Sequence, residues 1–316
     1  MFLGEHFWLD AAALALALIW DIALGEPPAV VHPVVWMGKI IAWLERRAPK
    51  VGHIAQFSYG LDMALVIPAA FATAGYFVAV GSRDLNPIAY ILIVGFLLKS
   101  CFAVRGLGHT ANAIREKLEA GETNQARTDL SALVSRDTSK LTPSSAASAA
   151  VESVAENTTD SFIAPWLAFA LFGLPGVLAY RAVNTLDAMI GYRGKYEYLG
   201  KASARLDDVL NFIPARLSAI IIVLASPLRA HSARQALAVM SKEGSTTESP
   251  NAGLTMAAMA GALGVELEKT GHYRLGSGLR RPTAVDIVES VKVMQWVAFF
   301  GFCLTFILLM VHYAIW

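Results

Sequence analysis

Charged residues are scarce in this sequence of 316 residues, at only 16% of the chain, whereas 55% of the residues are hydrophobic. A soluble domain carries about 25% charged residues, so this chain has too few of them to cover a soluble surface of its size. The mean hydropathy of +0.50 instead predicts an outer face in contact with lipid. The net charge of +1 gives no reason to expect a nucleic-acid partner.

Several familiar motifs are also missing. The two cysteines, Cys101 and Cys303, both lie in apolar stretches, which argues against a disulfide framework or a thiolate metal site. The sequence contains no Walker motif, zinc-ligand spacing or Gly-x-Ser-x-Gly elbow. The first ten residues lack the basic region of a cleavable signal peptide, so we expect the N-terminus to be retained.

Long apolar segments predict an all-α, polytopic integral membrane protein. Three segments, 61–81, 87–104 and 293–315, reach the roughly 20 residues that a membrane-spanning helix needs. Lys99 lies near the end of the second, where we expect it to snorkel to the interface. Segment 8–24 contains two aspartates, segment 162–183 is interrupted by Gly-Leu-Pro-Gly, and segment 217–228 is too short to span.

The Gly-Leu-Pro-Gly sequence at 173–176 frees backbone groups that lipid cannot satisfy. It predicts a hairpin or a broken, re-entrant helix, although a buried helical core fits the same pattern. Four basic stretches follow the apolar segments, and if segments 162–183 and 217–228 both turn back, these stretches and a polar active site lie on the cytoplasmic side. Both termini then face outward. Segment 111–133 predicts an amphipathic helix with a break at Gly121. We expect one domain over 1–316.

Acidic residues recur at helical spacing in Glu152, Glu156 and Asp160. On a helix these three carboxylates lie along one face, and their mutual repulsion calls for a positive partner. Mg²⁺ prefers oxygen ligands and is commonly held by one or two carboxylates together with phosphates. The alternative is a solvated face paired with arginines. An apolar run follows at once, and polar residues at a membrane boundary are often functional.

A second polar constellation spans residues 181–216. Asn184 and Asp187 share one helical face, and four basic residues lie between them and Asp207 and Asp208. Arginine forks match phosphate and carboxylate geometry, so this composition suits a metal-bound polyphosphate. Intramolecular ion pairs are the alternative.

Three smaller features accompany these constellations. Arg136 precedes Asp137 and Thr138, which bind phosphate or cap a helix. Asn251 lies in a polar turn before a helix expected at 254–264, whose N-terminus can hold an anion. Asp21 needs a partner within its apolar segment, and His32 lies in a turn before a helix starting near Val34.

At this point the sequence resembles a known family. The segments that carry the resemblance are DIALGEPPAVVHPVVWMGK at 21–39, SRDT at 135–138, ESVAENTTDSFIAP at 152–165, AYRAVNTLDAMIGYR at 179–193, ASARLDDVLNFIPAR at 202–216 and SPNAG at 249–253. They look like the hallmarks of the CobD/CbiB family, the adenosylcobinamide-phosphate synthases of cobalamin biosynthesis. Glu26 departs from a common aspartate, and Glu248 departs from a common histidine.

The resemblance implies a ligase that uses ATP and Mg²⁺ in the inner membrane. It joins the propionate carboxylate of adenosylcobyric acid to (R)-1-amino-2-propanol phosphate, or to aminopropanol, giving adenosylcobinamide phosphate or adenosylcobinamide. The other partners are the lipid bilayer and, as an open question, a second copy in a homodimer.

The resemblance also suggests roles for the polar residues, which we expect to converge beside the lipid. Metal ligation falls to Glu152, Glu156 and Asp160. Catalytic roles fall to Glu156, Asp187, Asp207 and Asp208. Binding of substrates and phosphates falls to Arg136, Asn157, Asn184, Tyr192, Arg193, Arg205, Arg216 and Asn251.

Three other functions are compatible with a membrane protein of this composition. Relatives resembling the AmpE type are non-catalytic regulators, but they need not keep both charged clusters. A transporter places its charges at mid-membrane, whereas most of the charges here lie in loops. A membrane prenyl- or phosphotransferase also binds Mg-diphosphate through acidic residues.

Overall fold

The computed structural model describes residues 5–131, 133–134, 136–229 and 232–315. Ser135, which belongs to one of the family-like segments, lies outside these residues. Six helical stretches within the described residues are long and apolar enough to cross a membrane: His6–Ala23, His53–Leu85, Pro87–Glu119, Pro143–Ile190, Phe212–Arg229 and Ala284–Ile315. The predicted all-α, polytopic membrane fold is therefore confirmed.

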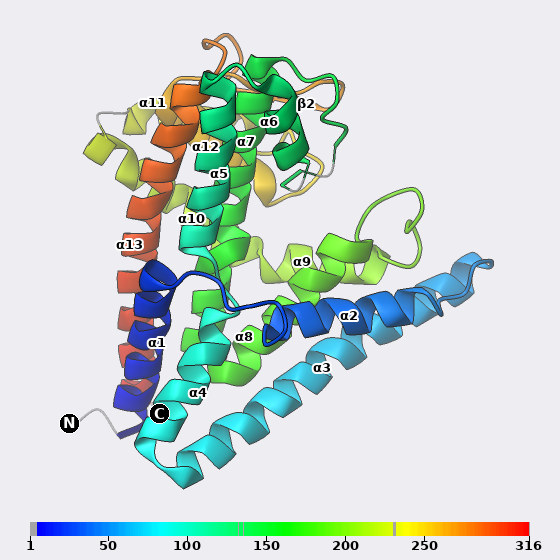
Figure 1. Ribbon diagram of the computed structural model, residues 1–316, viewed down its shortest axis with the longest axis vertical. Helices are drawn as coiled ribbons and strands as arrows, with labels where there is room; N and C mark the ends of the chain where they lie inside the picture. The colour runs from blue at the N-terminus through cyan, green and yellow to red at the C-terminus, as the bar shows by residue number, and fades with distance from the viewer. Residues whose placement is uncertain (1–4, 132, 135, 230–231, 316) are drawn as a thin grey trace. The chain divides into compact units, whose positions relative to one another are not determined.

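The chain divides into two compact units. The first unit contains residues 1–103, 164–210 and 303–316. Its helices are α1 (Glu5–Ala23), α2 (Pro33–Glu45), α3 (His53–Leu85), α4 (Pro87–Lys99), α8 (Ala164–Ile190), α9 (Lys201–Leu210) and the end of α13 (Ala284–Ile315). Helix α1 packs along α4, and α3 contacts both α4 and α8 (Figure 1). Asn86 joins α3 to α4 and accepts a hydrogen bond from the Ala89 amide, which caps α4.

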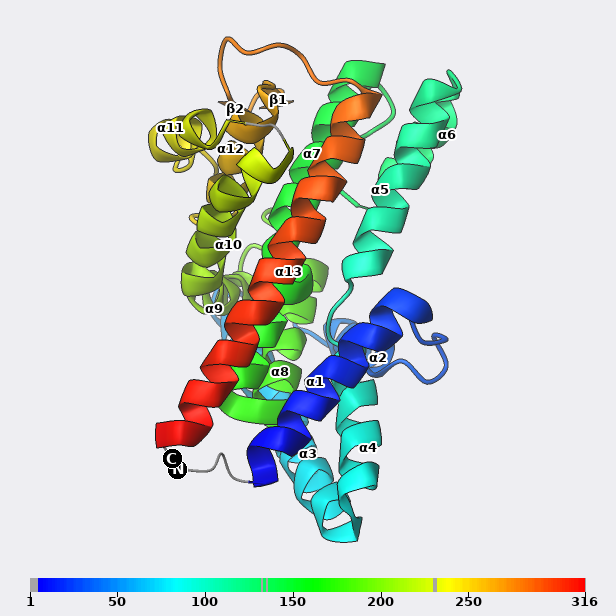
Figure 2. The same cartoon turned by 90° about the vertical axis from the view of Figure 1, so that its left-hand side faces the viewer.

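The second unit contains residues 104–163 and 211–302. Its helical elements are α5 (Val104–Glu119), α6 (Thr123–Leu130), α7 (Pro143–Thr158), the π-helical η1 (Thr159–Ile163), α10 (Phe212–Ala225), the 3₁₀ turn η2 (Ser226–Arg229), α11 (Ala233–Glu243), α12 (Ala252–Leu263) and the rest of α13. A short antiparallel hairpin joins β1 (Leu267–Lys269) to β2 (Tyr273–Leu275). Helix α12 packs against α7, α10 and α11, and α5 lies beside α6 (Figure 2).

Two breaks follow from local sequence. Gly121 adopts φ +77° between α5 and α6, which confirms the predicted interruption of the amphipathic segment. Gly173 adopts φ 63° and ψ −155° inside α8, a conformation that glycine reaches without the steric cost of a Cβ. The predicted break at 173–176 is present, and two helical pieces meet there.

Three details differ from the sequence expectations. Segment 217–228 was predicted to be too short to span, and this was wrong: the helix begins earlier, so α10 and η2 together cover 18 residues and are long and apolar enough to cross a membrane. Asp160 lies in the π-helical turn η1, so the three carboxylates do not continue along one uninterrupted α-helical face. The π turn contains more residues per turn than an α-helix and therefore shifts the side chains that follow.

Lys99 is the third difference. Its side chain is fully buried, and its ammonium lies 3.1 Å from an oxygen of Asp21 and 2.9 Å from an oxygen of Glu26. The prediction that it snorkels to the interface was wrong, because two carboxylates compensate its charge inside the first unit. The prediction that Asp21 needs a partner is confirmed. His32 contacts Glu26 at 3.2 Å and precedes α2, as its proline neighbour suggested.

Candidate functional site

Glu152 is the centre of a buried hydrogen-bond network in the second unit. One carboxylate oxygen accepts hydrogen bonds from Arg136 Nη2 at 2.8 Å and from the Tyr273 hydroxyl at 2.9 Å. The other accepts one from the Ser148 hydroxyl at 2.7 Å. We call these four residues the Glu152 network. Its members come from α7, from β2 and from the loop before α7, so they tie three segments together.

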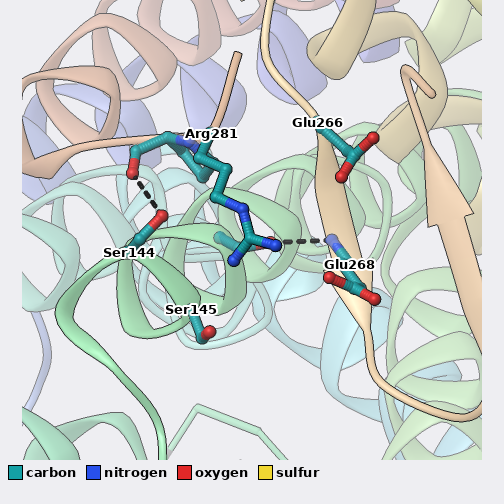
Figure 3. Close-up of a pocket in the computed structure, with 7 residues that line it drawn as sticks. Ser144, Ser145, Glu266, Glu268 and Arg281 are labelled. Atoms are coloured by element: carbon teal, nitrogen blue, oxygen red, sulfur yellow. Dashed lines mark hydrogen bonds between the residues drawn. The ribbon is translucent and has the colours of Figure 1, made fainter. Parts of the chain in front are cut away.

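The β-hairpin continues this network. The Glu268 amide of β1 donates to Ser148 Oγ at 2.9 Å, which Figure 3 shows as a dashed line. The recess drawn there is lined by the serines at the start of α7, by Arg281 and by two glutamates. Its volume is about 10 Å³, which holds one water at most. The recess is therefore too small for a substrate.

The pKa of the Tyr273 hydroxyl depends on the charges around it. Burial, followed by the negative charges of Glu152 and Glu156, raises the pKa of its hydroxyl. The phenol therefore stays protonated and donates its hydrogen bond at physiological pH. Glu156 lies one helical turn after Glu152 on α7, so its charge also acts on this hydroxyl.

Glu156, Asn157 and Asp160 follow Glu152 on α7 and η1. Glu156 is exposed, whereas Asn157 and Asp160 are partly buried. The Asn157 side-chain amide donates to the Ser153 carbonyl at 2.9 Å, so it is anchored to its own helix. Glu152 has three hydrogen-bond donors on its carboxylate, which favours a positioning role, while Glu156 and Asp160 keep more access to solvent.

Arg216 and Asn251 are brought together on α10 and at the start of α12. The Arg216 guanidinium lies 3.4 Å from the Asn251 side-chain oxygen, and it also donates to the Phe212 carbonyl at 2.7 Å. Its guanidinium carbon stacks 3.4 Å from the centroid of the Phe212 ring. This cation–π contact orients the fork, as expected for an arginine that recognises a planar anion.

The first unit contains the other predicted polar residues, on α8 and α9. Asn184 accepts from Arg181 Nη1 at 3.0 Å and donates to Asp207 at 3.4 Å. Arg205 pairs with Asp208 at 3.5 Å. We call Asn184, Arg205, Asp207 and Asp208 the Asp208 group. The contact from Asn184 to Asp207 and that from Arg205 to Asp208 are longer than the hydrogen bonds in the Glu152 network.

The Asp208 carboxyl group is a weaker acid than an ordinary aspartate. Burial raises its pKa, and the nearby Arg205 guanidinium only partly opposes that effect. The Arg205 side chain is 76% exposed, so its positive charge is screened by water. A carboxylate with a raised pKa next to an exposed cation is suited to accept a proton or to contact a cationic partner.

Asp187 occupies a crowded position near the end of α8. A Cβ placed on Gly191 would lie 2.0 Å from the Asp187 carboxylate oxygen. A residue larger than glycine at this position would therefore displace the carboxylate. Tyr192 and Arg193 follow in the exposed loop before α9, with the Tyr192 side chain 47% exposed. These loop residues are accessible to a substrate.

The positions of the acidic side chains bear on the predicted metal site. Within the described residues, no three His, Cys, Asp or Glu side chains gather closely enough to hold a metal ion. A three-carboxylate site at Glu152, Glu156 and Asp160 is thus not preformed. The oxygen donors still fit Mg²⁺ chemistry, because Mg²⁺ is usually bound by one or two carboxylates and completed by phosphates and water.

The predicted site residues therefore fall into two sets. One set, in the first unit, consists of Asn184, Asp187, Tyr192, Arg193, Arg205, Asp207 and Asp208. The other, in the second unit, consists of Arg136, Glu152, Glu156, Asn157, Asp160, Arg216 and Asn251. That all of them share one site stays a prediction.

Sequence reasoning missed several of these partners. Tyr273 lies 121 residues from Glu152, and no local pattern links the two. Ser148 precedes Glu152 by one helical turn and could have been found from that spacing. Glu26 and Lys99, which are 73 residues apart, pair through the fold of the first unit.

Comparison with known proteins adds an independent finding. A family model described as CobD/Cbib protein matches residues 14–297. The cobalamin biosynthesis protein CobD of Dehalococcoides mccartyi (strain CBDB1) is 51% identical over 265 residues, which cover 84% of this chain and 86% of that protein.

Two further relatives match over nearly their whole length. The probable cobalamin biosynthesis protein CobD of Pyrococcus abyssi (strain GE5 / Orsay) is 42% identical over 95% of this chain and 96% of its own. The cobalamin biosynthesis protein CobD of Geobacter metallireducens (strain ATCC 53774 / DSM 7210 / GS-15) is 38% identical over 91% of this chain and 90% of its own. No solved structure matches the chain.

Proposed function

Because this chain belongs to the CobD/CbiB family of cobalamin biosynthesis, we propose that it is an ATP-dependent, amide-forming ligase. Its substrates are adenosylcobyric acid and (R)-1-amino-2-propanol phosphate, or the dephosphorylated amine. The observation that carries the proposal is the Asp208 group, in which accessible carboxylates lie beside an exposed arginine. This composition suits the activation of a carboxylate by a phosphoryl group.

The chemistry requires an activated carboxyl group. A carboxylate does not react with an amine at neutral pH, because oxide is a poor leaving group. In the proposed route a propionate oxygen attacks the γ-phosphorus of ATP, the bond to ADP breaks, and an acyl phosphate forms. The amine then attacks the acyl carbon, releases inorganic phosphate and loses one proton. Catalysis of such a transfer rests mainly on positioning and charge neutralisation.

Residues of the first unit are proposed to handle the amine and one set of phosphates. Asp208 accepts the proton that the amine loses, because its raised pKa brings its affinity for protons closer to neutral pH. Arg205 and Arg193 bind phosphate oxygens, and Asn184 orients Asp207 through the contact between them. Asp187 contributes a further carboxylate, and Tyr192 lines the approach.

Residues of the second unit are proposed to hold Mg²⁺ and nucleotide phosphates. Glu156 and Asp160 offer accessible oxygens, whereas Glu152 fixes Arg136 in place. Bound Mg²⁺ neutralises phosphate charge. Arg216, held by Asn251 and Phe212, binds a phosphate or carboxylate. Asn157 orients the acidic turn that follows it.

The proposed location is the inner membrane, with the polar residues facing the cytoplasm. Basic residues that follow the apolar segments support this orientation. Arg46, Arg47 and Lys50 follow α2, and Arg193 and Lys195 follow α8. ATP and the amine are water-soluble, whereas the large corrin ring of the other substrate has apolar faces that lipid-facing helices can accept.

Purified full-length protein tests the proposal directly. With adenosylcobyric acid, aminopropanol phosphate, ATP and Mg²⁺, we expect the amide and ADP to form in equal amounts. Omission of ATP, or addition of EDTA, abolishes the product. Glu156→Ala and Asp208→Ala lose ligation while keeping the wild-type melting temperature. Glu197→Gln, which alters an exposed carboxylate in the same loop region, is the matched control and keeps activity. Wild-type rates in both alanine variants would show that the assigned residues are wrong.

A further inference from the structure

A cavity in the first unit lies apart from the Asp208 group. Its volume is about 290 Å³, close to the lower limit for small-molecule sites. It is lined by the ends of α3 and α13, by parts of α1 and α4, and by residues on both sides of the break at Gly173. Asn184 lies 11 residues beyond Gly173 on α8, roughly 16 Å along a helix axis, so this cavity is separate from the proposed catalytic residues.

A buried polar cluster forms one wall of this cavity. Asp10 is only 3% exposed, and its two oxygens accept hydrogen bonds from the hydroxyls of Tyr90 and Tyr313, the latter at 2.7 Å. The phenols therefore satisfy a carboxylate that would otherwise be costly to bury in a membrane helix. Arg83 does not bond Asp10 directly and instead reaches the Tyr90 hydroxyl at 3.3 Å.

Arg83 retains donors for another partner. Among the residues that the structure describes, its buried Nε has no hydrogen-bond partner. A guanidinium has five N–H donors, and a buried donor left without an acceptor is destabilising. The arginine borders the cavity. An anion in the cavity would supply the missing acceptor, and the fork geometry matches a phosphate.

Part of the cavity lining is apolar and exposed, as is typical of a lipid contact. Leu171, Phe172 and Tyr76 line the cavity and are 46%, 70% and 56% exposed. Trp8, 60% exposed near the start of α1, has the amphipathic ring that is enriched where hydrocarbon meets headgroups. Arg83 lies in the last turn of α3, at the end of a membrane-spanning helix, which is the level of lipid phosphates.

We propose that this cavity binds a membrane phospholipid, whose phosphate accepts hydrogen bonds from Arg83 and whose acyl chains lie along Leu171 and Phe172. The ligand class follows from a cationic fork and exposed apolar side chains that line the same cavity. The lipid holds the ends of α1, α3, α4 and α13 together. Its binding is independent of the ligase reaction.

The test uses delipidated full-length protein in detergent and native mass spectrometry with added phosphatidylglycerol. We expect one retained lipid per chain, and a higher melting temperature in its presence. Diacylglycerol with the same acyl chains lacks the phosphate and is not retained. Arg83→Gln weakens binding at least about tenfold, as expected for loss of a charged hydrogen bond. Arg46→Gln, an exposed arginine at another helix end of the same unit, is the matched control and binds like wild type.

A second variant guards against misfolding of Arg83→Gln. Ala79→Trp fills the cavity from a lining position while leaving the arginine in place, and we expect it to exclude the lipid as well. Unchanged lipid retention in either variant overturns the proposal. Inorganic phosphate at millimolar concentration should leave the lipid bound. Displacement of the lipid by inorganic phosphate, with equal thermal stabilisation, would mean that the site takes the free ion and would likewise overturn it.

Discussion

The Glu152 network and the Asp208 group, one in each compact unit, differ in how their charges are compensated. Glu152 is almost fully buried and accepts three hydrogen bonds of 2.7 to 2.9 Å. The carboxylates of the Asp208 group are half-buried, and the Arg205 side chain that pairs with Asp208 is 76% exposed. A buried, fully bonded carboxylate fixes structure, whereas a more accessible one is available to a substrate. The two sets of acidic residues therefore have different tasks.

Removing the Glu152 carboxylate is the strongest way to test this contrast. Glu152→Ala leaves Arg136 as a buried charge without its partner, which costs about 3–5 kcal/mol. We expect that loss in the free energy of unfolding, measured by denaturation in mixed detergent. Glu156→Gln alters an exposed neighbour on the same helix and should change the free energy of unfolding by less than about 0.5 kcal/mol. Equal destabilisation by both variants would remove the distinction between anchoring and accessible carboxylates.

Asp208→Asn gives the opposite pattern. Because its partner Arg205 is 76% exposed and therefore well screened by water, the free energy of unfolding should change by less than about 1 kcal/mol. The ligation rate should fall by about 10²–10⁴-fold if Asp208 accepts the proton of the amine. Stopped reactions analysed for amide and ADP measure this loss. A variant that loses stability but keeps its rate would place Asp208 with the anchoring residues.

Arg205→Ala tests the role of Asp208 through the pH dependence of the ligation rate. Burial raises the pKa of Asp208, and Arg205 lowers it, so removal of the arginine should raise that pKa further. Asp208 acts in its ionised form, and the rate therefore falls as pH drops through its pKa. The acidic limb of the rate profile should thus move to higher pH in Arg205→Ala. In Arg205→Lys it should stay near its wild-type position. An acidic limb that is identical in all three proteins assigns the titration to another group.

The smallest expected effect is that of Asn184→Ala. Its hydrogen bond to Asp207 is long, so the amide orients a carboxylate without holding a buried charge. We expect about a tenfold loss of ligation rate, equivalent to about 1.4 kcal/mol, with an unchanged melting temperature. Asn157→Ala, in the second unit, is the variant whose ligation rate and melting temperature are compared with those of Asn184→Ala. A larger effect on stability than on rate at Asn184 would contradict its assignment to the Asp208 group.

Local sequence was sufficient for much of the fold. Apolar length clearly identified three of the six candidate membrane helices in the described part of the chain. The glycines at 121 and 173 marked real breaks, because each adopts a positive φ. The charged segments at 152–165 and 179–216 carried both the family resemblance and the polar sets now found on α7, α8 and α9. These features depend on residues close together in the chain, which is why pattern alone predicts them.

Long-range pairing could not be predicted in the same way. A lysine at the end of an apolar helix can snorkel or be buried with a counter-ion. Lys99 is buried because Asp21 and Glu26 fold against it. Residue spacing on the helix does not distinguish Glu152 from Glu156. The partner of Glu152, Tyr273, lies 121 residues away in the sequence. The π turn at Asp160 likewise changes a helical face that residue spacing alone assumes to be regular.

Isotope transfer from the carboxyl substrate tests the central proposal most directly. Adenosylcobyric acid with both propionate oxygens labelled with ¹⁸O is converted to the amide by the purified enzyme with ATP and Mg²⁺. Activation through an acyl phosphate predicts one ¹⁸O in each released inorganic phosphate and one ¹⁸O retained in each amide, with unlabelled ADP. Amide formation with unlabelled phosphate, or with the label in AMP, would contradict phosphoryl activation of the carboxylate by this protein.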